Sequence, residues 1–464
     1  MDDHNADAGR RLPEGTLVSW YGDDFTGAAA VMEVLSFAGL PSVLFAGEPS
    51  PEQLENYRTF RGIGIAGTAR SRSPAWMEQH LPGAFKILAS INAPIAHYKT
   101  CSTFDSSVEI GSIGKAAEIA APILGGDWHP MIVAAPEIRR YQAFGNLFAA
   151  FGESTYRLDR HPVMSRHPVT PMREADILRH MALQTSMRLG LIDIADMAEH
   201  GIARAFEREL GNGAEVVAID IIDERTLADA GALVWRRRGK RTLALGSQGV
   251  EYALIAHWRR EGLLAREQAA FQNPRTGRTA AVSGSCSPVT ARQIEWAGRN
   301  GFSPIRVNPS LAVEPAAWKS EQERARVEAL DALGSGSNPL IYSALGPDDR
   351  AIAEFREAVA VSEKSLEDMN AAVGHGLGAI LHSIVKRTGI RRGAIAGGDT
   401  SSHGSTALGI FAFTALAPIA PGGGLCRACS DDPDIEGFEI ALKGGQIGQE
   451  DFFGRVRNGG SSPQ

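Results

Sequence analysis

Short apolar runs alternate with longer stretches of helical spacing along most of the chain. Before residue 250 the apolar runs are TLVSWYG, PSVLFAG, GIGIAG, PIAHYK, MIVAAP, EVVAID and RTLALGS. Beyond residue 278 the alternation resumes with TAAVSGS, SPIRVNP, NPLIYSALG, GAIAGG and GFEIALKGG. Strands that alternate with helices are typical of βαβ units. The pattern therefore predicts an α/β protein with two domains, each with a mainly parallel sheet flanked by helices.

One polar stretch interrupts this alternation. The segment Ala265 to Arg278 carries Pro, Asn, Gly and Arg without regular apolar spacing, which is typical of a linker. The expected organisation is a disordered tail over 1–14, an N-terminal domain over 15–264, a linker over 265–279, a C-terminal domain over 280–456 and a flexible tail over 457–464.

Composition and charge narrow the class of protein. The chain has 464 residues and a formal net charge of −7, with Lys and Arg scattered, so nothing indicates binding to nucleic acid or to an acidic membrane. No apolar run has the length of a signal peptide core followed by a cleavage site, or of a membrane span. Four cysteines do not make a disulfide framework. We expect a cytoplasmic protein with reduced thiols.

Two adjacent carboxylates, Asp23 and Asp24, lie between the run TLVSWYG and the helical pattern AAAVMEVLSFAG. Open α/β sheets bind ligands at the carboxyl ends of their strands, and Thr26 and Gly27 would present backbone N–H groups at the helix start. A helix N-cap explains one carboxylate but not the pair. Paired carboxylates are typical of acid/base or metal sites, so both are predicted to be catalytic.

Loops rich in glycine and hydroxyl groups follow three apolar runs of the second domain. Backbone N–H groups in such loops can approach a phosphate closely. The acid Asp399, beside hydroxyl groups, can hold Mg²⁺ directly or through water. The residues predicted to bind a nucleotide are Ser283, Ser285, Gly397, Gly398, Asp399, Thr400, Lys443, Gly444, Gly445 and Gly448.

In this order, the segments resemble the motifs of the four-carbon acid sugar kinase family. The family's DDxTGA appears as residues 23–28, its GSxSxxTxxQ as 284–293, its GGDT as 397–400 and its KxGxxG as 443–448. The resemblance covers nearly the whole chain. It implies an N-terminal domain that binds a sugar acid, a C-terminal domain that binds ATP with Mg²⁺, and an active site in the cleft between them.

The resemblance is looser in the acceptor domain. The family's KxDST…RGNxG appears as KTCSTFDSSVEIGSIG, in which the matching residues are Lys99, Ser102, Thr103 and Gly111. Cys101 replaces the acid and the Arg is missing, so the displaced Asp105 is the acid that could substitute. The family's PxxGRxTxxG appears as PEIRRYQAFG, with matches at Pro136, Arg140 and Gly145 and departures at Arg139 and Gln142. Because these departures lie in the acceptor domain, they bear on which acid is bound more than on the phosphoryl transfer.

An acid substrate needs cations, and Arg can hold a carboxylate through two parallel hydrogen bonds. Four cations are predicted near strand ends, and we expect about two of them to touch the substrate. The residues predicted to bind the substrate are Thr26, Gly27, Arg70, Arg72, Lys99, Ser102, Thr103 and Arg140.

The combined prediction is an ATP-dependent kinase that phosphorylates a hydroxyl of a small sugar acid, with Asp23 or Asp24 accepting or orienting the acceptor proton. The family includes kinases of threonate, erythronate, 3-oxo-tetronate and the branched 3-oxo-isoapionate, and the YGDDFTG and KTCSTFDSS variants resemble the last. Two alternatives stay open: an oxidoreductase that binds a dinucleotide at Gly62–Gly67, and a non-catalytic sugar-acid sensor. A homodimer is the default expectation for a soluble enzyme.

Two further patterns are interpreted as structural. Cys426 and Cys429 have the spacing of half a zinc site, but no second pair accompanies them, so two loop thiols are expected. His382 lies on the apolar face of a predicted helix, where a hydrogen-bonded packing residue is expected.

Overall fold

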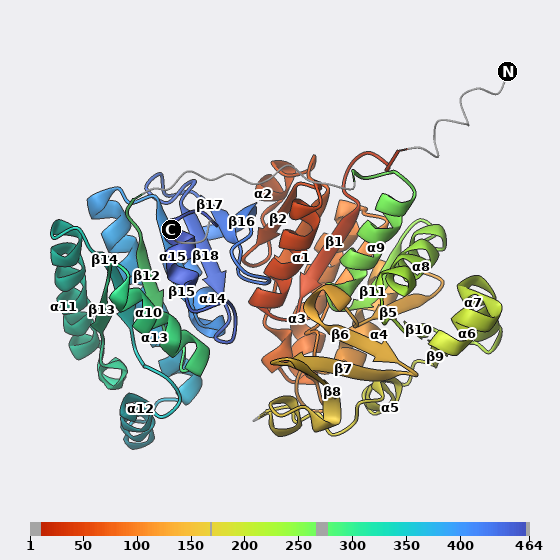
Figure 1. Ribbon diagram of the computed structural model, residues 1–464, viewed down its shortest axis with the longest axis horizontal. Coiled ribbons are helices and arrows are strands. Elements are labelled where there is room, and N and C mark those ends of the chain that lie inside the picture. Colours follow the sequence, from red (N-terminus) through yellow and green to blue (C-terminus); the bar gives the residue numbers. More distant parts are fainter. Residues whose placement is uncertain (1–10, 168, 266–276, 461–464) are drawn as a thin grey trace. The chain divides into compact units, whose positions relative to one another are not determined.

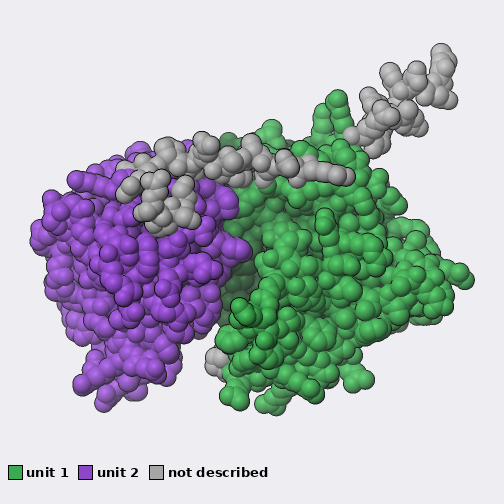
Figure 2. All heavy atoms as spheres, viewed as in Figure 1, with its two compact units in different colours: residues 1–268 green, residues 269–464 purple. Residues whose placement is uncertain are grey.

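The computed structural model describes residues 11–167, 169–265 and 277–460 (Figure 1). The chain divides into two compact units, Met1–Gln268 and Ala269–Gln464 (Figure 2). Both units carry a sheet flanked by helices, which confirms the predicted α/β class. Residues 1–10 of the expected tail and most of the expected linker over 265–279 lie outside the described residues.

The first unit is built on an eight-stranded sheet in which every neighbouring pair is parallel. Its spatial order is β2 (Ser42–Phe45), β3 (Gly62–Ala66), β1 (Val18–Gly22), β4 (Ile95–Lys99), β11 (Thr242–Gly246), β5 (His129–Ile132), β10 (Val216–Ile219) and β9 (Leu189–Ile192). Since the strands are parallel, all their carboxyl ends meet at one edge of the sheet, where α/β proteins bind ligands.

Helices of the first unit follow most of these strands. They are α1 (Phe25–Phe37), α2 (Pro51–Glu55), α3 (Pro74–Ile91), α4 (Ile113–Leu124), α5 (Ile177–Ala182), α6 (Ile194–His200), α7 (Ile202–Gly211), α8 (Glu224–Arg236) and α9 (Gly249–Arg260). The core between the sheet and α3 and α4 includes Tyr21, Phe85 and Tyr98, whose rings pack edge-on or stacked. A separate antiparallel sheet joins β6 (Arg140–Ala143), β7 (Asn146–Phe151) and β8 (Ser154–Arg157), which the apolar pattern did not predict.

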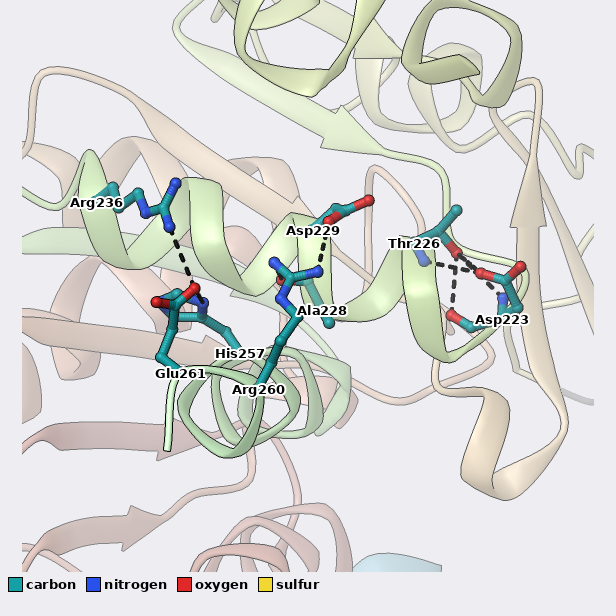
Figure 3. A network of polar contacts seen from close by, with 8 residues as sticks. All are labelled: Asp223, Thr226, Ala228, Asp229, Arg236, His257, Arg260 and Glu261. Atoms are coloured by element: carbon teal, nitrogen blue, oxygen red, sulfur yellow. Dashed lines mark hydrogen bonds and ion pairs between the residues drawn. The ribbon is translucent and has the colours of Figure 1, made fainter. Parts of the chain in front are cut away.

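Helices α8 and α9 pack against each other beside the sheet (Figure 3). Asp223 caps α8, and Arg260 Nη1 donates a hydrogen bond to Asp229 Oδ1 over 2.6 Å. Such partly exposed ion pairs contribute about 0–1 kcal/mol each. The buried edge-on contact between Trp235 and Trp258, whose ring centroids are 5.0 Å apart, holds the two helices together more strongly.

The second unit has a seven-stranded sheet. Its order is β13 (Phe302–Arg306), β14 (Asn338–Tyr342), β12 (Ala280–Ser283), β15 (Arg392–Ala396), β18 (Glu439–Lys443), β17 (Leu425–Ser430) and β16 (Ile410–Ala417). The first five strands are parallel, and β17 runs antiparallel to both of its neighbours. The helices are α10 (Pro288–Arg299), α11 (Pro315–Gly334), α12 (Arg350–Val361), α13 (Leu366–Thr388), α14 (Gly398–Ala407) and α15 (Phe452–Arg457).

Two local expectations need adjustment, whereas the expected hydrogen bond of His382 is confirmed. Cys426 and Cys429 are buried on β17 rather than in a loop, because β17 lies between two other strands. His382 is half-buried on α13 and its Nε2 lies 3.1 Å from Asp432 Oδ2. Arg457, expected at the start of a flexible tail, is the last residue of α15.

None of the helices among the described residues combines the length and the apolar character needed to cross a membrane.

Candidate functional site

The carboxyl ends of β3, β1 and β4 lie side by side in the first unit. Gly22 at the end of β1 is in register with Ala66 and with Lys99 on its two neighbours. The backbone continues this connection, since Asp23 N–H donates to Lys99 O over 2.9 Å and Arg70 N–H donates to Asp23 O over 3.0 Å. The two carboxylates, Arg70 and Lys99 are therefore neighbours, although they lie far apart in the sequence.

Asp24 is the N-cap of α1. Its Oδ1 accepts a hydrogen bond from Gly27 N–H over 3.0 Å, and its Oδ2 lies 3.1 Å from Arg70 Nη1. The positive end of the helix dipole also favours a carboxylate at this position. The side chains of Asp24 and Arg70 are 16% and 38% exposed, so both can be reached by a ligand.

Asp23 has a different environment. Its side chain is only 1% exposed, and neither carboxyl oxygen has a hydrogen-bond partner among the described residues. Burial, and then the neighbouring charge of Asp24, raise the pKa of Asp23 to about 7, against the opposing charges of Arg70 and Lys99. The two adjacent carboxylates thus differ in exposure and in partners.

Lys99 and Asp24 border the same space beside Gly27. Lys99 is buried, and its Nζ donates to Thr100 O over 2.6 Å. A Cβ added at Gly27 would lie 2.4 Å from Asp24 Oδ1 and 2.7 Å from Lys99 Nζ. Since real Cβ atoms do not approach this closely, a larger residue at position 27 would require the side chain of Asp24 or of Lys99 to shift.

The segment after β4 brings a third acid to this site, and β6 brings a third cation, Arg140. Asp105 is buried, and its charge acts on Asp23, Arg70 and Arg140. Cys101 Sγ lies 3.1 Å from Thr103 Oγ1, and burial and the charge of Asp105 raise the pKa of the thiol to about 11. Cys101 is therefore a neutral thiol at neutral pH.

Of the four predicted cations, Arg70, Lys99 and Arg140 lie near these acids. Burial lowers the pKa of Arg140, while Cys101 and Asp105 oppose that shift. Arg72 instead donates from Nε to Thr68 Oγ1 over 3.4 Å, and its guanidinium lies 5.4 Å from the centre of the Trp76 ring. Its role in substrate binding stays a prediction.

The two departures in PEIRRYQAFG have local explanations. Arg139, where the related motif has glycine, has a φ of +56°, so the left-handed backbone that glycine favours is kept. Gln142 is buried and its Nε2 donates to Asp220 Oδ1 over 3.1 Å. The same oxygen accepts from Gly145 N–H over 3.0 Å, so Gln142 belongs to the contacts that hold the β6–β7 turn.

In the second unit, three glycine loops meet at the carboxyl ends of β12, β15 and β18. A Cβ at Gly284 would lie 2.2 Å from Thr400 Oγ1, and one at Gly397 would lie 2.9 Å from the same atom. A Cβ at Gly445 would lie 2.8 Å from Ser285 Oγ. The glycine backbones therefore lie directly against the hydroxyl groups of Thr400 and Ser285, which forms a cradle of N–H and hydroxyl groups of the kind that binds phosphate.

Two residues of α10 hold the third loop, and they were not among the predicted site residues. Thr290 Oγ1 donates to Gly445 O over 2.9 Å and lies 3.0 Å from Lys443 Nζ. Gln293 Nε2 contacts three successive carbonyls of residues 447–449 at 2.9–3.1 Å. Both occupy named positions of the GSxSxxTxxQ motif at residues 284–293, which was the available signal. Burial lowers the pKa of Lys443 to about 7.

The cradle opens on a pocket of about 280 Å³ within the second unit. Asp399 and Thr400, at the start of α14, line it together with apolar side chains that include Pro309, Phe355 and Val373. No cluster of three or more His, Cys, Asp or Glu residues that could hold a metal occurs in the described part of the chain. Asp399 is thus a single protein carboxylate beside a phosphate cradle, an arrangement that suits Mg²⁺ bound mainly by phosphate oxygens and water.

A larger pocket of about 890 Å³ lies between α8 and α9 in the first unit, lined by residues such as Glu224, Tyr252 and Arg259. None of the predicted site residues lines it, so its size does not make it the functional site.

The glycines of GIGIAG serve packing. A Cβ at Gly64 would lie 2.0 Å from the Trp20 ring, and one at Gly67 would lie 2.0 Å from Tyr21 Oη. Gly62 to Ala66 form the buried strand β3, so these residues offer no helix start to a dinucleotide.

Two family models match the chain. Residues 18–254 match a sugar-binding N-terminal domain, and residues 280–453 match a nucleotide-binding C-terminal domain. A relative from Paraburkholderia graminis named 3-oxo-isoapionate kinase is 44% identical over 96% of this chain and 95% of its own. A 3-oxo-tetronate kinase from Pectobacterium atrosepticum is 28% identical over 94% of this chain and 97% of its own.

Two solved structures share the fold over nearly their whole length. A Haemophilus influenzae protein has a TM-score of 0.72 and 25% identity, with 96% of this chain and 100% of that chain covered. A Salmonella typhimurium protein that carries a provisional tRNA synthase name has a TM-score of 0.76 and 25% identity, with 94% and 98% covered.

Proposed function

The chain belongs to the four-carbon acid sugar kinase family, and on that premise we propose that it transfers the γ-phosphoryl group of ATP to a hydroxyl of a 3-oxo sugar acid. The 44% identity to a 3-oxo-isoapionate kinase favours that branched acid over the linear tetronates, whose kinases are about 28% identical. The observation that carries the proposal is the pair of strand-end sites: acids beside cations in one unit, and a glycine cradle beside a buried lysine in the other.

In the first unit, we assign contact with the acceptor to Asp24 rather than to Asp23. Asp24 is the more exposed of the two and is held in place by Gly27 and Arg70. A positioned carboxylate can accept the proton of the attacking hydroxyl. The guanidinium of Arg70, with Lys99 and Arg140, would hold the carboxylate of the acid. Asp23, which is buried next to Asp24, would contribute by holding Asp24 in position.

In the second unit, the loops at Ser285, Gly397–Thr400 and Gly444–Gly448 would hold the phosphates, and the apolar pocket would receive the rest of the nucleotide. Lys443 lies beneath the third loop and would regain its proton as phosphate charge approaches, which strengthens binding. Mg²⁺ bound with the nucleotide would supply neutralisation of the phosphate charge, and Asp399, which lines the pocket, would hold it.

In the transfer itself, the acceptor oxygen forms a bond to the γ-phosphorus as the bond from that phosphorus to the bridging oxygen of ADP breaks. The hydroxyl proton passes to Asp24. Catalysis then consists mainly of positioning and charge neutralisation, as is usual for phosphoryl transfer.

The test is release of ADP by purified protein with Mg²⁺ and ATP, across threonate, erythronate, 3-oxo-tetronate and 3-oxo-isoapionate. Acid-dependent turnover that is lost in Asp24→Asn and Asp399→Asn but kept in the exposed control Asp127→Asn would support the proposal. Nucleotide binding without turnover on any of these acids would contradict it and favour a non-catalytic sensor.

A further inference from the structure

We propose that Asp105 forms a hydroxyl-binding subsite within the acceptor site, and that it selects acids with a hydroxyl group at the matching carbon. The inference rests on the proposed function and adds to it a recognition residue and the group of the substrate that this residue binds. The Asp105 carboxylate lacks a hydrogen bond that a buried acceptor normally has, and the turn that carries it has a strained backbone.

The carboxylate of Asp105 is buried without a full set of hydrogen bonds. Its side chain is 7% exposed, and Oδ1 accepts no hydrogen bond from any described residue. Buried carboxylate oxygens normally accept at least one, because an unsatisfied buried acceptor is unfavourable. A donor that arrives with a ligand would complete this acceptor.

The turn that carries Asp105 is held in a strained conformation. Phe104 has a φ of +57°, in the left-handed region that a bulky side chain rarely adopts. Such strain persists where surrounding contacts impose it, and it gathers at ligand sites.

Ser106, on the other side of Asp105, provides those contacts. Its Oγ donates to Phe104 O over 3.0 Å, lies 2.8 Å from His180 Nε2, and accepts from Gln184 Nε2 over 3.0 Å. Gln184 in turn accepts from Ile113 N–H over 2.8 Å, at the start of α4. The position of Asp105 is thus fixed by the contacts of its neighbour Ser106, and His180, which makes one of these contacts, lies within electrostatic reach of Asp105.

The charges around Asp105 decide which ligand group it takes. Arg70 and Arg140 lie within electrostatic reach of Asp105, as does Asp23. The carboxylate of an acid substrate would go to the guanidinium groups and would be repelled by Asp105. An ionised carboxylate only accepts hydrogen bonds, so the complementary group is a hydroxyl of the same substrate. The neutral thiol of Cys101 beside it adds no second negative charge.

The experiment compares Asp105→Asn and Asp105→Ala with Asp127→Asn, which removes one exposed carboxylate from the same unit. Steady-state kinetics give KM for the acid, KM for ATP and kcat. A lost hydrogen bond to a charged group predicts a fall in kcat/KM for the acid of roughly 10- to 100-fold in Asp105→Ala. That fall should come mainly from KM for the acid, with KM for ATP unchanged.

A second measurement needs no variant. Wild-type protein is tested by calorimetry with threonate and with 2,4-dihydroxybutanoate and 3,4-dihydroxybutanoate, each of which lacks one hydroxyl of threonate. One of the two deoxy acids should bind at least 10-fold more weakly, and Asp105→Ala should remove that difference.

The outcomes separate this inference from the proposed function. Equal binding of threonate and both deoxy acids, or an unchanged KM for the acid in Asp105→Ala, would overturn the subsite. An equal rise in KM for the acid and for ATP would also overturn it, since that indicates general disruption. Acid binding without turnover in the wild type would contradict the kinase but leave the subsite measurable by calorimetry, and failure to bind any acid, 3-oxo-isoapionate included, would overturn both.

Discussion

Asp23 should destabilise the folded protein as the pH rises, and Asp23→Asn should remove this effect. Burial and Asp24 raise the pKa of Asp23 to about 7 in the folded state. In the unfolded chain the carboxyl has an ordinary pKa of about 3.9. The folded state therefore binds the proton more tightly, and the stability linked to it is fully present below about pH 4 and is lost as the pH rises to about 7.

The size of the effect follows from the pKa difference. Three pKa units at about 1.36 kcal/mol each give roughly 4 kcal/mol. The difference in unfolding free energy between Asp23→Asn and wild type should grow in favour of the variant by roughly this amount from pH 4 to pH 7. It should be constant above that range. A buried amide adds an offset of its own, but that offset does not depend on pH.

Thermal unfolding from pH 4.5 to pH 8, with Asp127→Asn as the control for removal of an exposed carboxylate, measures this difference. For a unit of this size each kcal/mol corresponds to about 2–4 °C in Tm. The control should track the wild type at every pH. If the Asp23→Asn difference in Tm were the same at pH 4.5 and pH 8, Asp23 would ionise like an exposed carboxyl, and the assignment of Asp23 as a buried, protonated neighbour of Asp24 would be wrong.

Four further predictions concern single residues. Asp24→Asn keeps a side chain that can cap α1, so stopped-flow or steady-state assays should find kcat lowered by about 10²- to 10⁴-fold with Tm little changed; an unaltered kcat would assign the proton to another group. Gly27→Ala places a Cβ 2.4–2.7 Å from two side-chain atoms of the site, so acid binding measured by calorimetry should weaken while ATP binding is kept. The pKa of Lys443 is lowered to about 7, so the lysine is protonated below and neutral above that pH; ATP affinity should fall above pH 7, and Lys443→Met should flatten this dependence. Glu251→Gln alters the buried hydrogen bond between Glu251 Oε1 and His97 Nδ1, which are 2.7 Å apart, and should lower the unfolding free energy in urea titrations by about 1–3 kcal/mol; an unchanged free energy would show that the contact contributes no net stability.

The apolar pattern was sufficient for the fold class because it records local periodicity. Strands β1, β3 and β4 read as continuous apolar runs since they are buried on both faces, as in any parallel sheet covered by helices. Strands β6 to β8 were missed because their residues are mostly half-buried or exposed, and only β7 carries a short apolar run. Strand β17 was interpreted as a loop because Arg427 and the two cysteines leave it without a continuous apolar run.

The order of motifs along the chain likewise predicts a site at strand ends. A loop that directly follows a strand of a parallel sheet must lie at the carboxyl edge, whatever the order of the strands. Asp24, Arg70, Lys99 and the three glycine loops could therefore be predicted as site residues from the sequence.

Only the tertiary structure decided how these residues differ from one another. Asp23 and Asp24 are adjacent in the sequence, but one is buried and without partners among the described residues, while the other caps a helix and holds Arg70. Thr290 supports a loop about 155 positions away, and Asp105 is held by contacts of Ser106 that include His180. Local sequence carries periodicity and turn chemistry, whereas burial, pKa and the partner of a side chain depend on every element packed around it, and these are set only when distant segments come together.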